Sequence, residues 1–141
     1  MRAVADTNVV VSGLFGHGVP RRILDLAHAG SVDLYTSAVL LAELEDVLGR
    51  PLFAQHLESL GLTPSSLVLN YSALATLVSP ATISAVITDD PDDDAVLACA
   101  LAARADAIVS GDKHLLSLGR FQGIPVVSAL GLLNMLTKSL S

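Results

Sequence analysis

Short apolar segments alternate along this chain with segments of helical periodicity, and this alternation restricts the possible folds more than any other feature. Apolar strands are expected at residues 2–5, 32–36, 85–88, 106–110 and 124–127. Helices are expected at residues 21–29, 39–48, 51–60, 64–78, 92–103, 112–118 and 128–136, while residues 9–11 could extend the first strand or begin a helix. Strands joined by helices pair in parallel, so we predict an α/β fold, a three-layer α/β/α sandwich with a mostly parallel central sheet.

Length and composition indicate one domain over residues 1–141, with an aliphatic core. The chain is 52% apolar but only 4% aromatic. A single cysteine, Cys99, excludes a disulfide framework and a thiolate zinc site. The chain has no apolar run of the ~20 residues that a membrane span needs, and its start is too poor in apolar residues for a signal peptide. We therefore expect a soluble cytoplasmic protein without a membrane partner.

Acidic residues follow the predicted strands at the edge of the sheet where ligands bind. Asp6 follows the first strand and Asp112 follows residues 106–110, while Glu43 lies in the second turn of the helix after residues 32–36. A further acidic run contains five of the 14 Asp and Glu residues: Asp89, Asp90, Asp92, Asp93 and Asp94. Four separate segments are thus expected to bring carboxylates to one edge of the sheet.

Clustered carboxylates repel one another, by about 4 kcal/mol for each pair at 4 Å and an effective dielectric constant of 20. Such a cluster must hold protons or bind cations, and oxygen ligands suit Mg²⁺ or Mn²⁺. Two such ions can activate water for phosphodiester hydrolysis. The chain has neither a glycine-rich phosphate loop nor a nucleophile elbow. The sequence therefore indicates metal-dependent phosphoryl chemistry.

Four motifs in the same order resemble those of PIN-domain ribonucleases. They are VADTNVVVSG (residues 4–13), LAEL (41–44), DAVLACA (94–100) and IVSGD (108–112). The longer runs DPDDD (90–94) and ADAIVSGDKHLL (105–116) are similar to the branch of this family that contains toxins of toxin–antitoxin pairs, the relatives of the VapC toxins. The resemblance covers about residues 2–133.

The resemblance implies an α/β/α nuclease that cuts RNA with Mg²⁺ or Mn²⁺. Carried over by motif, the catalytic and metal-binding quartet is Asp6, Glu43, Asp94 and Asp112, with Asp93 as an additional metal ligand. Thr7, Asn8 and Ser110 are expected to orient the carboxylates rather than to bind metal. Members of the VapC type usually form homodimers and are inhibited by a protein antitoxin, so both partners are expected here.

Several alternatives remain open at this stage. Either Asp93 or Asp94 could be the main third acid. A catalytically silent PIN-like scaffold remains possible, and so does a phospho-aspartyl domain, although that class needs a second acid near Asp6. The net charge of −6 argues against a binder that relies on charge alone. Lys113 and His114 could meet phosphate or lie on an exposed helix face. The leucine-rich residues 52–78 could cover the sheet or form a subunit or antitoxin surface.

Overall fold

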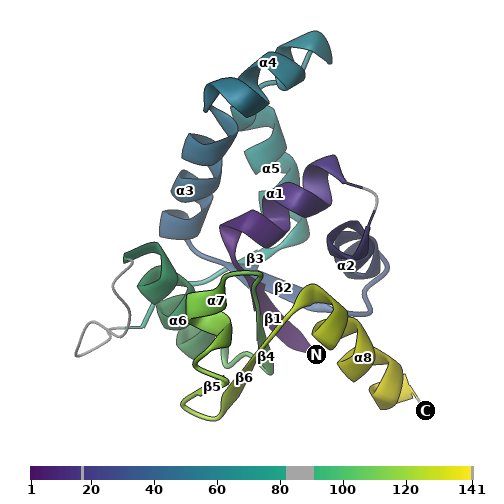
Figure 1. Cartoon of the computed structure of the whole chain (residues 1–141), viewed down its shortest axis with the longest axis vertical. Helices are drawn as coiled ribbons and strands as arrows, with labels where there is room; N and C mark the ends of the chain where they lie inside the picture. Colours follow the sequence, from purple (N-terminus) through teal and green to yellow (C-terminus); the bar gives the residue numbers. More distant parts are fainter. Residues whose placement is uncertain (17, 82–90, 141) are drawn as a thin grey trace.

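The computed structural model describes residues 1–16, 18–81 and 91–140. The strands are β1 (Arg2–Ala5), β2 (Asp33–Thr36), β3 (Thr76–Leu77), β4 (Ala107–Val109), β5 (Arg120–Phe121) and β6 (Ile124–Val127). The helices are α1 (Thr7–Phe15), α2 (Val19–His28), α3 (Ala38–Leu48), α4 (Pro51–Ser59), α5 (Pro64–Leu74), α6 (Pro91–Ala103), α7 (Lys113–Leu116) and α8 (Ala129–Leu140). Figure 1 shows how they are arranged.

One sheet runs through the molecule in the order β3-β2-β1-β4-β6-β5. All neighbouring strands are parallel except β5, which is antiparallel to β6. In the central pair, Ala5 of β1 lies opposite Val109 of β4. The predicted α/β class with a mostly parallel sheet is therefore confirmed, and the carboxyl ends of β1 and β4 lie side by side.

Helices cover both faces of the sheet. Consecutive strand residues point to opposite faces, so Ala3 and Ala5 join a core cluster with α1, α2, α3, α5 and α8. Val4 and Ile108 join a second cluster, with α6 and α7. Figure 1 shows α6 and α7 on one side of the strands, α2 and α8 on the other, and α4 at the far end of an arm built by α3 and α5. This is the predicted three-layer arrangement.

The starts of several helices were predicted correctly from local sequence signals. Ser37 caps α3, because its hydroxyl accepts a hydrogen bond from the Leu40 N–H at 3.3 Å. Pro51 is the first residue of α4, a position where its missing N–H costs nothing. Residues 9–11 belong to α1, which begins directly after Asp6.

Two predicted elements differ from the structure or lie outside it, and one observed strand was not predicted. The helix expected over residues 64–78 ends at Leu74, and residues 76–77 instead pair with β2 as the short strand β3. The turn before residue 124 contains β5, which sequence analysis did not predict. The predicted strand at residues 85–88 lies outside the described residues. None of the helices in the described ranges is long and apolar enough to cross a membrane.

Candidate active site

Asp6 joins the end of the central strand to the start of a helix. Its backbone N–H continues the sheet by donating to the Val109 carbonyl at 3.0 Å. Its Oδ1 caps α1 by accepting a hydrogen bond from the Val9 N–H at 3.0 Å. The side chain is buried, with 5% of the residue exposed. The chain folds this way because an aspartate is a favourable N-cap and β1 ends just before it.

The neighbouring strand β4 ends in a second polar link. Ser110 is fully buried, and its hydroxyl donates a hydrogen bond to Oδ2 of Asp6. The same Oγ accepts a hydrogen bond from the Asp112 N–H at 2.9 Å. Asp112 then caps α7, because its Oδ1 accepts from the His114 N–H at 3.0 Å. One serine hydroxyl therefore connects the two acids that follow the central strands.

Helix α3 contributes the third acid from the side of β2. Glu43 is half-buried in the second turn of this helix. The Thr7 hydroxyl at the start of α1 donates a hydrogen bond to its carboxylate. Thr7 is itself buried, so it connects α1 to α3 at the site.

The acidic first turn of α6 is divided between two faces of the helix. Asp92 and Asp93 lie with Val96 along the site, as the helical spacing of these positions allows. Asp93 is buried, whereas Asp92 is exposed. Asp94 is half-buried and is not among the residues that line the site.

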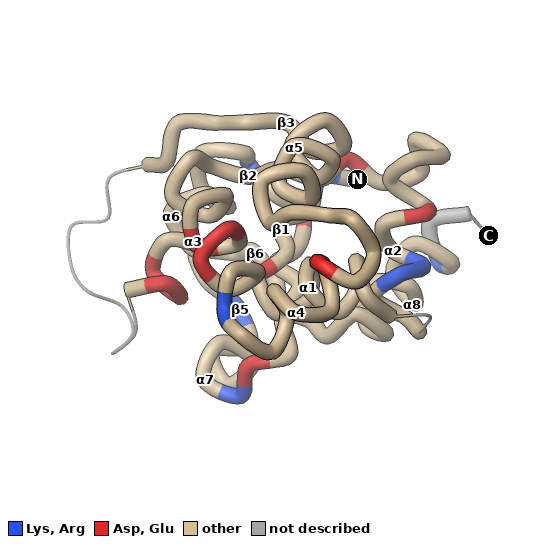
Figure 2. The backbone as a smooth tube through the Cα atoms, turned by 90° about the horizontal axis from the view of Figure 1, so that it is seen from above, with Lys and Arg blue, Asp and Glu red and all other residues tan. Residues whose placement is uncertain are grey.

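These four segments enclose a pocket of about 70 Å³ at the carboxyl edge of the sheet. Five of its lining side chains are carboxylates, contributed by the ends of β1 and β4 and by α3 and α6. Figure 2 shows acidic positions along α3 and at the start of α6, and an acidic position beside a basic one at α7. The lining residues are Asp6, Thr7, Asn8, Glu43, Asp92, Asp93, Val96 and Asp112.

Burial and mutual repulsion make two of the carboxylates harder to ionise. Burial is the main cause that raises the pKa of Asp6, and the charge of Asp112 raises it further, against the opposing hydrogen bonds from Ser110 and Val9. Burial likewise raises the pKa of Glu43, with added repulsion from Asp92 and Asp6. The pocket is thus an environment that favours protons or cations.

The donor set has the chemistry of a site for a hard divalent cation. Carboxylate oxygens are the ligands that Mg²⁺ and Mn²⁺ prefer. Within the described ranges, however, no three His, Cys, Asp or Glu side chains are grouped as a ready-made metal site. The residues therefore fit such an ion by their chemistry, and binding requires the carboxylates to turn toward a common point.

Sequence analysis and structure agree on most of this pocket. The structure brings together Asp6, Glu43, Asp93 and Asp112 with Thr7 and Asn8, and it places Ser110 directly behind Asp6. It leaves the predicted Asp94 outside the lining. Asp92 was missed, and no signal in the sequence singles it out, because the residues four positions after Asp92, Asp93 and Asp94 are all apolar.

Comparison with known proteins identifies the family. Residues 2–114 match the model of the PIN domain. The chain is also 31% identical to the uncharacterized protein MJ1680 of Methanocaldococcus jannaschii over 119 residues, which covers 84% of this chain and 75% of that protein. PIN domains are generally nucleases and generally use divalent metal ions. With four fifths of its length matched by the family model, the chain belongs to the PIN domain family.

Proposed function

We propose that this protein is a metal-dependent endoribonuclease that hydrolyses RNA phosphodiester bonds. The observation that carries the proposal is the convergence of five carboxylates from four chain segments on one pocket. A structural explanation accounts for only part of this set, because Asp6 and Asp112 cap helices, whereas Glu43 lies in the second turn of α3, a helix that Ser37 caps. The lining contains five carboxylates and no Lys, Arg or His, and such a set of oxygen donors is suited to metal-assisted phosphoryl chemistry.

The side chains have distinct parts in this proposal. Asp6, Glu43, Asp93 and Asp112 would hold Mg²⁺ or Mn²⁺, which supplies Lewis acidity and a more acidic bound water. The Ser110 hydroxyl orients one oxygen of Asp6 through its hydrogen bond, and the Thr7 hydroxyl orients the Glu43 carboxylate in the same way.

Asp93 is proposed as the main third acid in place of Asp94. It is buried against the pocket, whereas Asp94 lies outside the lining. Asp93→Asn should reduce cleavage of unstructured RNA at least a hundredfold, about 2.7 kcal/mol of barrier. Asp94→Asn is the matched neighbour and should keep most of the activity. The reverse order of effects would assign the role to Asp94.

A pair of substitutions on α3 tests the whole site. Glu43→Gln should reduce metal-dependent cleavage at least a hundredfold. Glu45→Gln removes the same charge two residues away, where the carboxylate is exposed and accepts a hydrogen bond from the Ser65 hydroxyl. It should leave the rate within a few-fold of wild type. Equal activity of all three proteins would remove the proposed mechanism.

Metal binding can be measured without activity. An ion that binds only the folded protein at a hundred times its Kd stabilises it by about 2.7 kcal/mol. For a chain of this size that raises Tm by about 8 °C. Saturating Mn²⁺ should produce this shift in wild type and a smaller one in Glu43→Gln. If wild type shows neither RNA cleavage nor a Mn²⁺-induced rise in Tm, the result would favour the catalytically silent scaffold.

We also propose a toxin role, a protein antitoxin and a homodimer, all supported by the sequence resemblance. The arm offers further support, because it carries exposed leucines on and around α4 and α5: Leu52, Leu60, Leu62 and Leu69. Induced expression of wild type, but not of Asp112→Asn, should arrest growth. A monomeric mass by light scattering would contradict the dimer.

A further inference from the structure

The pocket offers no attraction for the phosphates on either side of the bond that is cut. Its five carboxylates carry a formal charge of −5, and even two divalent cations would leave it negative. No Lys or Arg is among its lining residues. A single-stranded RNA must nevertheless bring several phosphates past the rim of this pocket. Affinity for nucleic acid depends largely on cations that contact those phosphates. The positive charge must therefore come from just outside the pocket.

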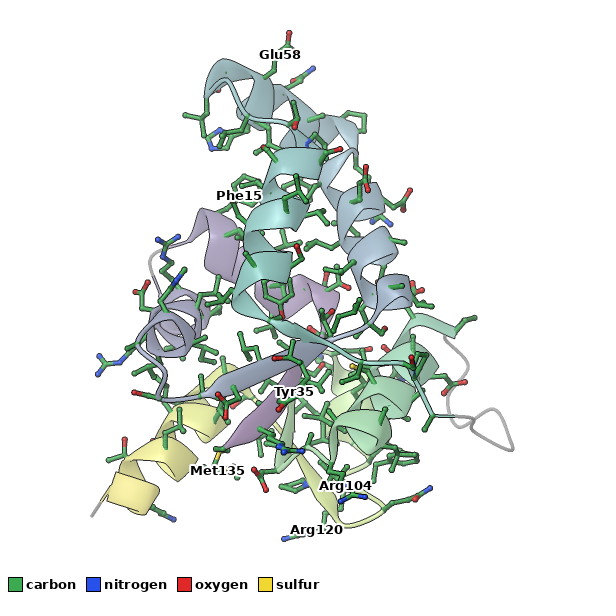
Figure 3. The ribbon with its side chains drawn as sticks, turned by 180° about the vertical axis from the view of Figure 1, so that it is seen from behind. Phe15, Tyr35, Glu58, Arg104, Arg120 and Met135 are labelled. Atoms are coloured by element: carbon green, nitrogen blue, oxygen red, sulfur yellow. The ribbon has the colours of Figure 1, made fainter. Side chains whose placement is uncertain are left out.

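Most of the basic residues lie far from this rim. The chain has eight Lys and Arg residues, all of them within the described ranges. Three of them are near the amino ends of the strands, the opposite edge of the sheet: Arg2 begins β1, Arg104 follows α6, and Arg120 pairs with Pro125 near the start of β6. Figure 3 shows Arg104 and Arg120 together below the sheet.

Four other cations are also placed elsewhere. Arg21 and Arg22 lie on α2, where each lines a different pocket that contains none of the acids of the candidate site. Arg50 forms an ion pair with Asp46 at 3.5 Å near the start of α4. Lys138 is in the last turn of α8, about 15 Å along the helix from its start at the carboxyl edge.

Lys113 is the remaining cation, and it adjoins the pocket. It is the first residue of α7 and directly follows Asp112, whose carboxylate lines the pocket. The Lys113 side chain is exposed, and among the described residues it has no ion-pair partner. Its ammonium group is therefore available to a ligand.

The other sides of the rim are acidic or neutral. On the α6 side the exposed Asp92 and half-buried Asp94 would repel a phosphate, and Glu45 on α3 adds to the same field. On the α1 side the exposed residue is the neutral Asn8. The rim is thus electrostatically one-sided, with its positive charge at the start of α7.

We propose that Lys113 binds a backbone phosphate next to the scissile bond, so that the RNA strand crosses the rim over α7 and away from α6. This inference rests on the proposed ribonuclease function. A lysine in this place acts as a point charge without base preference, which suits a contact to the backbone. It would set the affinity for substrate and the path of the strand rather than the chemistry of cleavage.

Steady-state cleavage of a labelled single-stranded RNA in saturating Mn²⁺, over a range of salt concentrations, tests the proposal. Lys113→Gln should raise KM about tenfold, as expected for the loss of one charged hydrogen bond, and leave kcat nearly unchanged. The slope of log(kcat/KM) against log[salt] should become less negative by about 0.7, the value for one phosphate contact to a single strand. Lys113→Arg should restore both quantities, because it keeps the charge.

Lys138→Gln is the matched control, since it removes the same charge at the far end of α8. It should leave KM and the salt slope at wild-type values. Equal behaviour of Lys113→Gln and Lys138→Gln, with wild type active, would overturn the role of Lys113 and leave the ribonuclease proposal standing. Absence of RNA cleavage by wild type would overturn both. A change in kcat alone would also count against a phosphate contact.

Discussion

The hydroxyl of Ser110 should stabilise the protein far more than an ordinary serine hydroxyl does. Removing it in Ser110→Ala breaks two hydrogen bonds, a part-buried one from the Asp112 N–H at 2.9 Å and a buried one to the carboxylate of Asp6. A neutral bond contributes about 1 kcal/mol and one to a charged group about 1.5–3 kcal/mol. We therefore expect a loss of about 3 kcal/mol in the free energy of unfolding and a drop in Tm of about 10 °C without metal.

A double-mutant cycle with Asp6→Asn separates the charged bond from the rest. Asparagine keeps an acceptor for the Val9 N–H but removes the charge, so Ser110→Ala should cost about 1–2 kcal/mol less in that background. The cycle is measured by urea denaturation in EDTA at mildly alkaline pH, because burial raises the pKa of Asp6 and a higher pH favours its ionised form. Ser128→Ala is the control, because Ser128 is exposed and its Oγ accepts a cap hydrogen bond from the Gly131 N–H at 3.0 Å; it should cost about 1 kcal/mol.

Two results would refute this reasoning. One is a cost for Ser110→Ala no larger than that for Ser128→Ala. The other is the same cost in the wild-type and Asp6→Asn backgrounds. Either result would mean that the link between Ser110 and Asp6 is not a charged hydrogen bond in solution.

Three further predictions concern packing and pH. Gly13→Ala should lower Tm, because the added Cβ would lie 2.8 Å from Cδ1 of Leu24 and 3.0 Å from the Pro20 carbonyl oxygen. This crowding should outweigh the helix preference of alanine over glycine, which is about 1 kcal/mol. An unchanged or raised Tm would show that α1 and α2 can move apart. Within the described ranges the buried Tyr71 hydroxyl has no hydrogen-bond partner. Tyr71→Phe should therefore leave the free energy of unfolding unchanged or raise it by up to about 1 kcal/mol. A clear loss of stability in this variant would contradict the prediction. Because the folded-state pKa of Glu43 is raised, its contribution to stability is present below its unfolded pKa and is lost as pH rises through the folded value. The Tm advantage of Glu43→Gln over wild type in EDTA should therefore grow over that pH range, and a constant difference would argue against the shift.

Helix starts could be predicted from the sequence because their causes are local. A serine before an apolar periodic segment caps α3, and a proline begins α4. Strands β3 and β5 could not be predicted in the same way. Each has two residues, and each is a strand only because a distant or reversed segment lies beside it. Short strands depend on such pairing rather than on intrinsic preference.

In the candidate site, too, some residues could be predicted from the sequence and others depend on how the elements pack. Asp6 and Asp112 could be placed because each follows an apolar strand, and parallel strands bring their carboxyl ends together. The run from Asp92 to Asp94 gives no such guide, since three adjacent carboxylates occupy three directions around a helix. Only the docking of α6 against the sheet decides which of them face the pocket, and the structure places Asp92 and Asp93 there.

The double use of Asp6 and Asp112 has a consequence for related chains that lose activity. Each carboxylate accepts the backbone hydrogen bond that starts a helix, and asparagine, serine or threonine can accept it as well. A lineage released from selection for catalysis can therefore exchange the charge at these two positions while the helices stay capped. Under the proposed function, a neutral capping residue at both positions would mark a relative that keeps the fold without the proposed metal chemistry.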